Sequence, residues 1–267
     1  MTRKKVLFIL QAIEPYVTAS VLAEMGREIP GKIQEMGNEI RVFLPKWGTI
    51  NERRNQLHEV IRLSGLNVII NDVDHMLIVK VASLQSVKIQ VYFIDNEDFF
   101  HTPFTSAQES TTTALEGGIF YCRSVLETIR SLRWTPDIIH CQGPISATAP
   151  YFIKTAYKDD PSYRNTRVVY SFHGLFNDDP LPENFKECLA FRDYDVAKID
   201  SFGIPLHTSR DLGKLVMKFT DGVIVAEEDA PTELLDYAEG QGKKVLPYEE
   251  SDNQAARFAD FYDLLLQ

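Results

Sequence analysis

The sequence predicts an α/β fold, a single doubly wound domain with a mixed sheet and a β-hairpin insertion. Three observations predict it. Short β-branched runs alternate with stretches of helical periodicity, which is typical of parallel strands joined by crossover helices. Two strand candidates follow each other with only a short connection, as in a hairpin. No repeat, low-complexity tract or linker interrupts the pattern, so residues 1–267 are expected to form one domain.

The chain opens with a β-α-β pattern. A strand from Val6 to Gln11 and a strand from Ile40 to Leu44 flank apolar residues spaced by 3, 4, 4 and 3, which place them on one helical face. These residues are Leu22, Met25, Ile29, Ile33 and Met36. Later parallel-strand candidates are Asp137 to Cys141, Val168 to Phe172, Val223 to Ala226 and Lys244 to Leu246.

The hairpin is predicted from Leu77–Val81 and Ile89–Ile94, which are joined around residues 83–86. A long helix should run from about Leu115 to Leu132, and another should follow the strand at 137–141. Residues 103–113 and 177–182 are polar and should form loops. Phe258, Phe261 and Leu265 predict a closing amphipathic helix from about Gln254 to Leu266, after which the chain is expected to be complete.

Composition excludes several classes of function. The formal charge of −10 would repel a polyphosphate backbone, so nucleic acid is not an expected partner. No apolar stretch approaches the roughly 18 to 20 residues that span a bilayer, and the opening lacks a signal-peptide core, so we expect a cytoplasmic protein without a membrane partner. Cys122, Cys141 and Cys188 form no close pair and are expected to be free, buried thiols.

Several segments resemble one enzyme family. Residues 8–30 follow without a gap the pattern F-x-x-x-E-x-x-P-F-x-K-T-G-G-L-A-D-V-x-x-x-L-P, which opens bacterial glycogen and starch synthases. The similarity continues at residues 38–45, 91–100, 136–140 and 147–150 and covers residues 4 to about 175. The chain is therefore identified as similar to glycosyltransferase family 5, and in particular to short, stand-alone bacterial synthase-like proteins.

The resemblance implies a Rossmann-like domain that corresponds to the N-terminal half of a GT-B enzyme. In that family the N-terminal domain holds the glucan acceptor and a second domain holds most of the ADP-glucose donor. The implied reaction moves glucose from ADP-glucose to an α-1,4-glucan, with no cofactor and no metal. Only the first of the two domains is expected in this chain.

The opening loop departs from the family pattern. The family's lysine, threonine and two glycines fall at Thr18, Ala19, Ser20 and Val21. Glycines let backbone N–H groups at a helix N-terminus approach a diphosphate, and a lysine adds charge. Thr18 brings no charge and Val21 blocks a close approach, so this segment is expected to be a helix entry capped by Thr18 or Ser20. Tyr16, Thr18 and Ser20 remain candidate sugar contacts.

Two histidines occupy the ends of predicted neighbouring strands. The family signature H-x-H-D-W-H-T becomes His140-Cys141-Gln142-Gly143-Pro144-Ile145-Ser146, and the family's T-I-H-N becomes Ser171-Phe172-His173-Gly174. His140, Gln142 and His173 are therefore candidate sugar ligands, since ligands bind at the carboxyl ends of strands in open α/β sheets. The alternative for both histidines is a buried structural role.

Two further clusters have weaker signals. Trp47 and Arg53 could stack against and clasp a sugar after the second strand, or they could be solvated loop residues. Asp72, Asp74 and His75 have metal-ligand chemistry, but their spacing favours a turn.

The sequence leaves two functions open. The resemblance favours a glycogen synthase-type transferase, although the substitutions and the expected lack of a donor domain argue against turnover by this chain alone. The alternative is a non-catalytic glucan-binding or regulatory module. Possible ligands are an α-glucan or a nucleotide sugar, and possible assemblies are a homo-oligomer or a complex with a full synthase.

Overall fold

A computed structural model describes residues 3–84, 87, 89–101, 103, 112–173, 176–228, 230–251 and 253–267. Within these residues the main sheet contains nine strands in the order β11-β10-β9-β8-β1-β2-β7-β6-β3. Their bounds are β1 Lys5–Leu10, β2 Glu39–Pro45, β3 His58–Glu59, β6 Ile78–Leu84, β7 Ile89–Asp95, β8 Ile138–Gln142, β9 Arg167–Phe172, β10 Gly222–Val225 and β11 Lys244–Leu246.

The sheet is doubly wound, as the sequence predicts. From the central strand β1 the chain proceeds through β2 to β7, then crosses to β8 on the other side of β1 and continues to β11. All pairs from β11 to β7 are parallel. The direction of winding therefore reverses between β1 and β8, which is the position where open α/β sheets bind ligands at their carboxyl edge.

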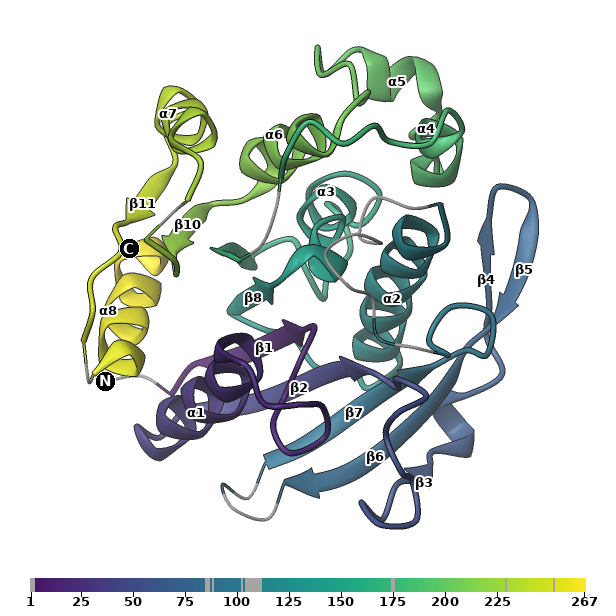
Figure 1. Cartoon of the computed structure of the whole chain (residues 1–267), viewed down its shortest axis with the longest axis vertical. Helices are drawn as coiled ribbons and strands as arrows, with labels where there is room; N and C mark the ends of the chain where they lie inside the picture. The colour runs from purple at the N-terminus through teal and green to yellow at the C-terminus, as the bar shows by residue number, and fades with distance from the viewer. Residues whose placement is uncertain are drawn as a thin grey trace.

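Helices cover both sides of the sheet (Figure 1). Helices α1 (Val21–Glu35) and α8 (Gln254–Leu266) pack together on one side, whereas α2 (Thr112–Ser131), α3 (Ala149–Lys154) and α6 (Ser209–Phe219) lie on the other. The remaining helices are α4 (Phe185–Leu189), α5 (Val196–Asp200), α7 (Thr232–Gly240) and two 3₁₀ turns, η1 (Ile61–Leu63) and η3 (Pro144–Ser146). The predicted helices at 115–132 and 254–266 are confirmed.

The closing helix α8 returns to the first strand of the chain. Phe258, Phe261, Tyr262 and Leu265 are buried along one of its faces. The ammonium of Lys4 lies 2.6 Å from a carboxylate oxygen of Asp263 and joins the start of β1 to α8. The two ends of the chain therefore pack as neighbours, and α8 covers one side of the sheet near its centre (Figure 1).

The predicted hairpin exists, but its place in the sheet differs from the prediction. β6 and β7 are antiparallel partners, yet β7 also pairs in parallel with β2 and is part of the main sheet rather than an insertion beside it. Strand β6 continues through Ser83 and Leu84, which the sequence placed in the connection. Residues 85, 86 and 88 of that connection, and residues 104–111 of the loop predicted at 103–113, lie outside the described residues. The end of that loop prediction is wrong, because Thr112 and Thr113 form the first turn of α2.

A second hairpin was missed. Strands β4 (Asn67–Ile70) and β5 (Val73–Met76) form a separate two-stranded sheet. Asn71 and Asp72 make its turn with φ values of 46° and 63°, which short polar residues tolerate. The predicted turn at residues 72–75 is thus right for Asp72 and wrong for Asp74 and His75, which lie within β5.

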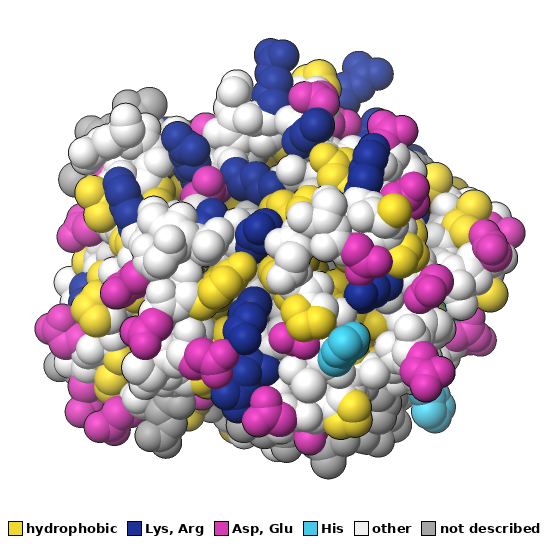
Figure 2. All heavy atoms as spheres, turned by 90° about the horizontal axis from the view of Figure 1, so that it is seen from above, with side chains coloured by type: hydrophobic (Ala, Val, Ile, Leu, Met, Phe, Trp, Pro, Cys, Tyr) yellow, Lys and Arg dark blue, Asp and Glu magenta, His cyan; other side chains and the backbone are white. Residues whose placement is uncertain are grey.

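Three smaller expectations can be compared with the structure. All three cysteines are buried and free. Among the residues that the structure describes, no helix is both long and apolar enough to span a bilayer. On the face of the molecule shown in Figure 2, basic side chains stand among acidic and uncharged ones rather than forming a continuous basic surface.

Candidate functional site

The candidate site is the edge of the sheet where β10, β9, β8 and β1 end side by side. These strands are parallel neighbours, so their carboxyl ends meet at one edge. His140 lies inside β8, Gln142 is the last residue of that strand, and His173 directly follows β9. The prediction that the two histidines belong to neighbouring strands is confirmed. The prediction that both stand at strand ends is right for His173 and wrong for His140, which is the middle residue of β8.

His140 is enclosed by the protein. His140 is almost fully buried, with 2% of its surface exposed. The Tyr262 hydroxyl of α8 hydrogen-bonds Nδ1 at 2.6 Å, and the Ser171 hydroxyl of β9 hydrogen-bonds Nε2. The rings of Phe8 and Phe258 lie 5.3 Å and 5.7 Å from the imidazole, measured between centroids. Both ring nitrogens of His140 are thus engaged within the chain.

Burial sets the charge of His140. Removing the imidazole from water lowers its pKa from 6.5 to about 3, and the neighbouring His173 adds a smaller effect in the same direction. The ring is therefore neutral at physiological pH. A neutral imidazole has one donor and one acceptor nitrogen, and hydroxyl partners such as Tyr262 and Ser171 can satisfy either.

A second chain of contacts links the ends of β8, β9 and β10. The amide nitrogen of Gln142 lies 3.3 Å from Nε2 of His173, and Nδ1 of His173 lies 3.2 Å from a carboxylate oxygen of Glu227. With Gln142 donating to Nε2, the proton of His173 sits on Nδ1 and is donated to Glu227. His173 is 2% exposed, whereas the Glu227 side chain is 45% exposed, so this chain of contacts reaches the surface through its carboxylate.

The loop after β8 is held against the end of β1. The amide oxygen of Gln11 accepts a hydrogen bond from the backbone N–H of Ile145 at 3.2 Å. Gly143 has a φ of 83°, and a Cβ there would lie 2.9 Å from the same amide oxygen. Only glycine suits both the backbone angle and this close approach. Pro144 and Ile145 then begin a buried 3₁₀ turn, so they fill the region with apolar atoms.

The opening loop behaves as the helix entry that the sequence predicts. Ser20 caps α1, since its hydroxyl accepts a hydrogen bond from the N–H of Ala23 at 3.2 Å. Thr18 is exposed. The side chain of Val21 is 69% exposed at the first turn of α1, where it lines a groove of about 410 Å³ together with Tyr248 and Phe258.

Trp47 and Arg53 lie in different surroundings, since Trp47 is buried and Arg53 is exposed. Trp47 is 1% exposed, donates its indole N–H to the carbonyl oxygen of Gln11 at 3.0 Å and packs edge-on against Phe100. The expectation of a solvated or sugar-stacking tryptophan is therefore wrong, because its faces are covered by the core. Arg53 is exposed and does not line the cavity of about 850 Å³ that the adjacent Arg54 lines.

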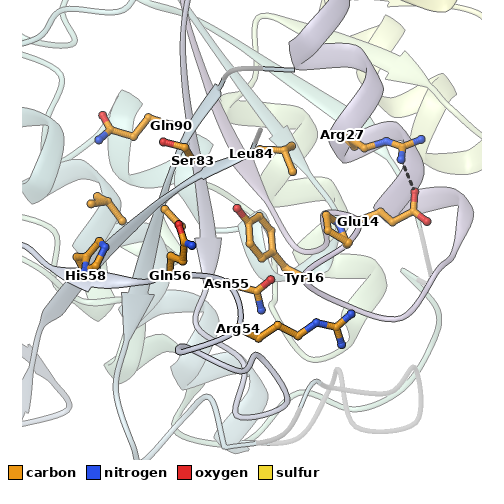
Figure 3. Close-up of a pocket in the computed structure, with 13 residues that line it drawn as sticks. Glu14, Tyr16, Arg27, Arg54, Asn55, Gln56, His58, Ser83, Leu84 and Gln90 are labelled. Atoms are coloured by element: carbon orange, nitrogen blue, oxygen red, sulfur yellow. Dashed lines mark ion pairs between the residues drawn. The ribbon is translucent and has the colours of Figure 1, made fainter. Parts of the chain in front are cut away.

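Tyr16 lies in a different place from the two histidines. It is 6% exposed and packs edge-on against Phe93 at 4.9 Å between ring centroids. It borders a cavity of about 850 Å³, and His140, Gln142 and His173 are not among the residues that line this cavity. Figure 3 shows Tyr16 between the Glu14–Arg27 ion pair and the side chains of Asn55 and Gln56. Tyr16 therefore lies apart from the predicted sugar ligands His140, Gln142 and His173.

Two contacts of this site were missed by sequence reasoning. Tyr262 occupies the position four residues after Phe258, so helical periodicity places both on the face that packs on the sheet, but periodicity does not name His140 as the partner. Glu227 lies two residues after the end of β10, and no local pattern in the sequence indicates its contact with His173. Among the described residues, no group of three or more His, Cys, Asp or Glu side chains is arranged to hold a metal ion.

Comparison with known proteins gives consistent results. A family model described as the starch synthase catalytic domain matches residues 5–246. Glycogen synthase from Pelodictyon phaeoclathratiforme is 37% identical over 182 residues, and that from Chlorobium chlorochromatii is 36% identical over 182 residues. Each alignment covers 67% of this chain and 37% of the relative, so the chain spans little more than a third of their length.

The fold also matches a solved structure. The catalytic domain of starch synthase IV from Arabidopsis thaliana, bound to ADP and acarbose, superimposes with a TM-score of 0.74. Sequence identity is 14%, and the match covers 92% of this chain and 51% of that chain. This similarity shows that the chain shares its α/β fold with about half of that GT-B catalytic domain.

Proposed function

Since this chain belongs to the starch synthase catalytic domain family, we propose that it is a glycogen or starch synthase-like protein that binds a carbohydrate of this pathway and does not itself transfer glucose. Its ligand would be an α-glucan or a nucleotide sugar. The transfer of glucose from ADP-glucose to an α-1,4-glucan is the reaction that the family resemblance implies. Here the side chains that the family signature would provide are replaced.

One observation carries the proposal. Of the specified residues in the family's H-x-H-D-W-H signature, this chain retains only the first histidine, His140. Both ring nitrogens of His140 are hydrogen-bonded within the protein, one to Tyr262 and the other to Ser171. A sugar hydroxyl would have to displace one of these buried hydrogen bonds. Loss of a single transition-state donor typically lowers turnover about 100- to 1,000-fold. Replacement of several signature residues therefore argues against transfer.

Carbohydrate binding is supported by a polar group that remains accessible at the carboxyl edge of the sheet, the carboxylate of Glu227. Glu227 is partly exposed and is connected through His173 to Gln142, so the carboxyl edge of the sheet still presents polar groups to a ligand. Carboxylates commonly accept hydrogen bonds from sugar hydroxyls. We further propose that the protein acts either as a homo-oligomer or together with a complete synthase, in a regulatory rather than a catalytic role.

Affinity electrophoresis tests the binding half of the proposal. In a native gel that contains glycogen, the protein should migrate more slowly than in a gel without it, and free maltose should reverse the effect. Replacement of His173 by alanine should weaken the retardation, whereas replacement of the exposed His207 should not. Circular dichroism checks that both variants are folded. Migration that glycogen leaves unchanged would contradict glucan binding.

A further inference from the structure

The cavity beside α1 has no role in the function proposed above. It measures about 850 Å³ and lies between the loop after β1, helix α1, the β6–β7 pair and the segment before β3. Small-molecule sites typically measure about 300–1,000 Å³. Its volume therefore suits a ligand of the size of one or two sugar rings.

The phenol group of Tyr16 lines this cavity. Tyr16 is 6% exposed, and its ring packs edge-on against Phe93. Its hydroxyl forms no hydrogen bond with any residue that the structure describes. Burial raises the pKa of Tyr16 to about 12, so the group is a protonated donor at neutral pH. Figure 3 shows its ring in the middle of the lining residues.

The cavity lining contains two arginines, of which one is in an ion pair with a described residue. Arg27 is paired with Glu14, with 3.0 Å between a guanidinium nitrogen and a carboxylate oxygen (Figure 3). Arg54 forms no ion pair with a described residue, so its guanidinium is a surplus positive charge in a chain with a formal charge of −10. A guanidinium offers two parallel N–H groups, a geometry that matches phosphate oxygens.

Amide groups provide the remaining contacts. The oxygen of the Gln90 amide accepts a hydrogen bond from the Tyr92 hydroxyl at 3.0 Å. Its NH₂ group has no hydrogen-bond acceptor among the described residues and can donate to a ligand. The Asn55 amide donates to the carbonyl oxygen of Asn51 at 2.9 Å, which leaves its own oxygen free to accept. A donor at one wall and an acceptor at the other are what hydroxyl groups of a sugar require.

We propose that this cavity binds a phosphorylated sugar, with the phosphate at Arg54, the Tyr16 hydroxyl donating to the ligand, and sugar hydroxyls on the amides of Asn55 and Gln90. The site is separate from the strand ends that carry His140 and His173. It therefore does not depend on whether those strand ends bind glucan.

Isothermal titration calorimetry with glucose 1-phosphate tests this site. Inorganic phosphate and maltose serve as separate probes of the two halves of the ligand. We expect glucose 1-phosphate to bind more tightly than either. Arg54→Gln should weaken its binding at least about tenfold, because charge-assisted hydrogen bonds to phosphate are lost. Tyr16→Phe keeps the ring and should weaken binding about two- to tenfold.

The neighbouring arginine supplies the matched control. Arg53→Gln removes the same charge from the same loop without changing the cavity lining, and should leave the dissociation constant unchanged. Three results would overturn the proposal: no saturable binding of glucose 1-phosphate below about 10 mM, equal binding by the Arg53 and Arg54 variants, or maltose or inorganic phosphate binding as tightly as glucose 1-phosphate. A lack of glycogen binding alone would leave it standing.

Discussion

The hydroxyl of Tyr262 lies 2.6 Å from Nδ1 of His140 and joins the last helix of the chain to the strand next to its first one. The two residues are 122 positions apart in the sequence. It also explains why His140 is closed to solvent, since Phe258 and Tyr262 of α8 both lie against the imidazole. In the family signature this histidine would contact a sugar. In this chain His140 is instead buried in the interface between α8 and the sheet.

This contact predicts a specific loss of stability. Tyr262→Phe should lower the free energy of unfolding by about 1–3 kcal/mol, because it leaves a buried imidazole nitrogen without its partner while the ring stays in place. Urea denaturation measures the change. Tyr248→Phe is the control, since Tyr248 is 40% exposed, and it should change stability by less than about 0.5 kcal/mol. Equal effects of the two substitutions would contradict the assigned contact.

The pKa of His140 predicts a pH dependence. Burial, and to a lesser extent His173, lowers this pKa to about 3, so unfolding lets the ring take up a proton below pH 6.5. The contribution to stability is present above pH 6.5 and is lost as the pH falls from 6.5 towards 3, by up to about 1.4 kcal/mol per pH unit. In urea denaturation, His140→Gln should reduce the slope of stability against pH in this window. An unchanged slope would mean that His140 is not buried in its neutral form.

Gly26 of α1 packs closely against the backbone of Ala12, in the loop that follows β1. A Cβ at Gly26 would lie 2.2 Å from the carbonyl oxygen of Ala12, whereas a Cβ at Gly240 in α7 meets no atom within 4 Å. Gly26→Ala should therefore destabilise the protein by about 1–3 kcal/mol through overpacking. Gly240→Ala should stabilise it by up to about 1 kcal/mol. Thermal or urea denaturation of the pair decides, and a neutral Gly26→Ala would refute the close packing.

Trp47 predicts a structural rather than a ligand-dependent effect. Trp47→Ala should cost about 3–5 kcal/mol of unfolding free energy, because a fully buried ring and its hydrogen bond to Gln11 are lost. Arg53→Ala should change stability by less than about 0.5 kcal/mol, because that side chain is exposed. In a Trp134→Phe variant, Trp47 is the only tryptophan that remains. A large change in its fluorescence on adding maltose would contradict the buried position and support stacking of Trp47 on a sugar.

Sequence periodicity predicted most of the fold because the sheet is largely parallel and buried. Its strands are continuous apolar runs, and the helices between them have one apolar face, so both patterns are visible along the chain. The hairpin β4–β5 was missed because its exposed face carries Ile69 and Met76 and so has no clear alternation of polar and apolar residues. The position of β7 within the sheet depends on its pairing with β2, which a local pattern does not contain.

The site could be predicted only in part. The placement of His140 and His173 on neighbouring strands followed from the strand pattern, but their partners come from residues far along the chain, such as Tyr262 and Glu227. Trp47 was misjudged because a Lys-Trp-Gly segment after a strand resembles an exposed loop, whereas the ring turns back to the carbonyl oxygen of Gln11. Which face of a loop a side chain occupies is decided by packing rather than by composition.

The most direct test of the central claim is the incorporation of labelled glucose from ADP-glucose into glycogen by the purified chain. Glycogen synthase from Chlorobaculum tepidum, a relative of 35% identity over 182 residues, provides the positive control. We predict no incorporation above background by this chain at any pH between about 5 and 8, the range in which its buried His140 stays neutral. Clear incorporation that is abolished by His140→Ala would contradict the account.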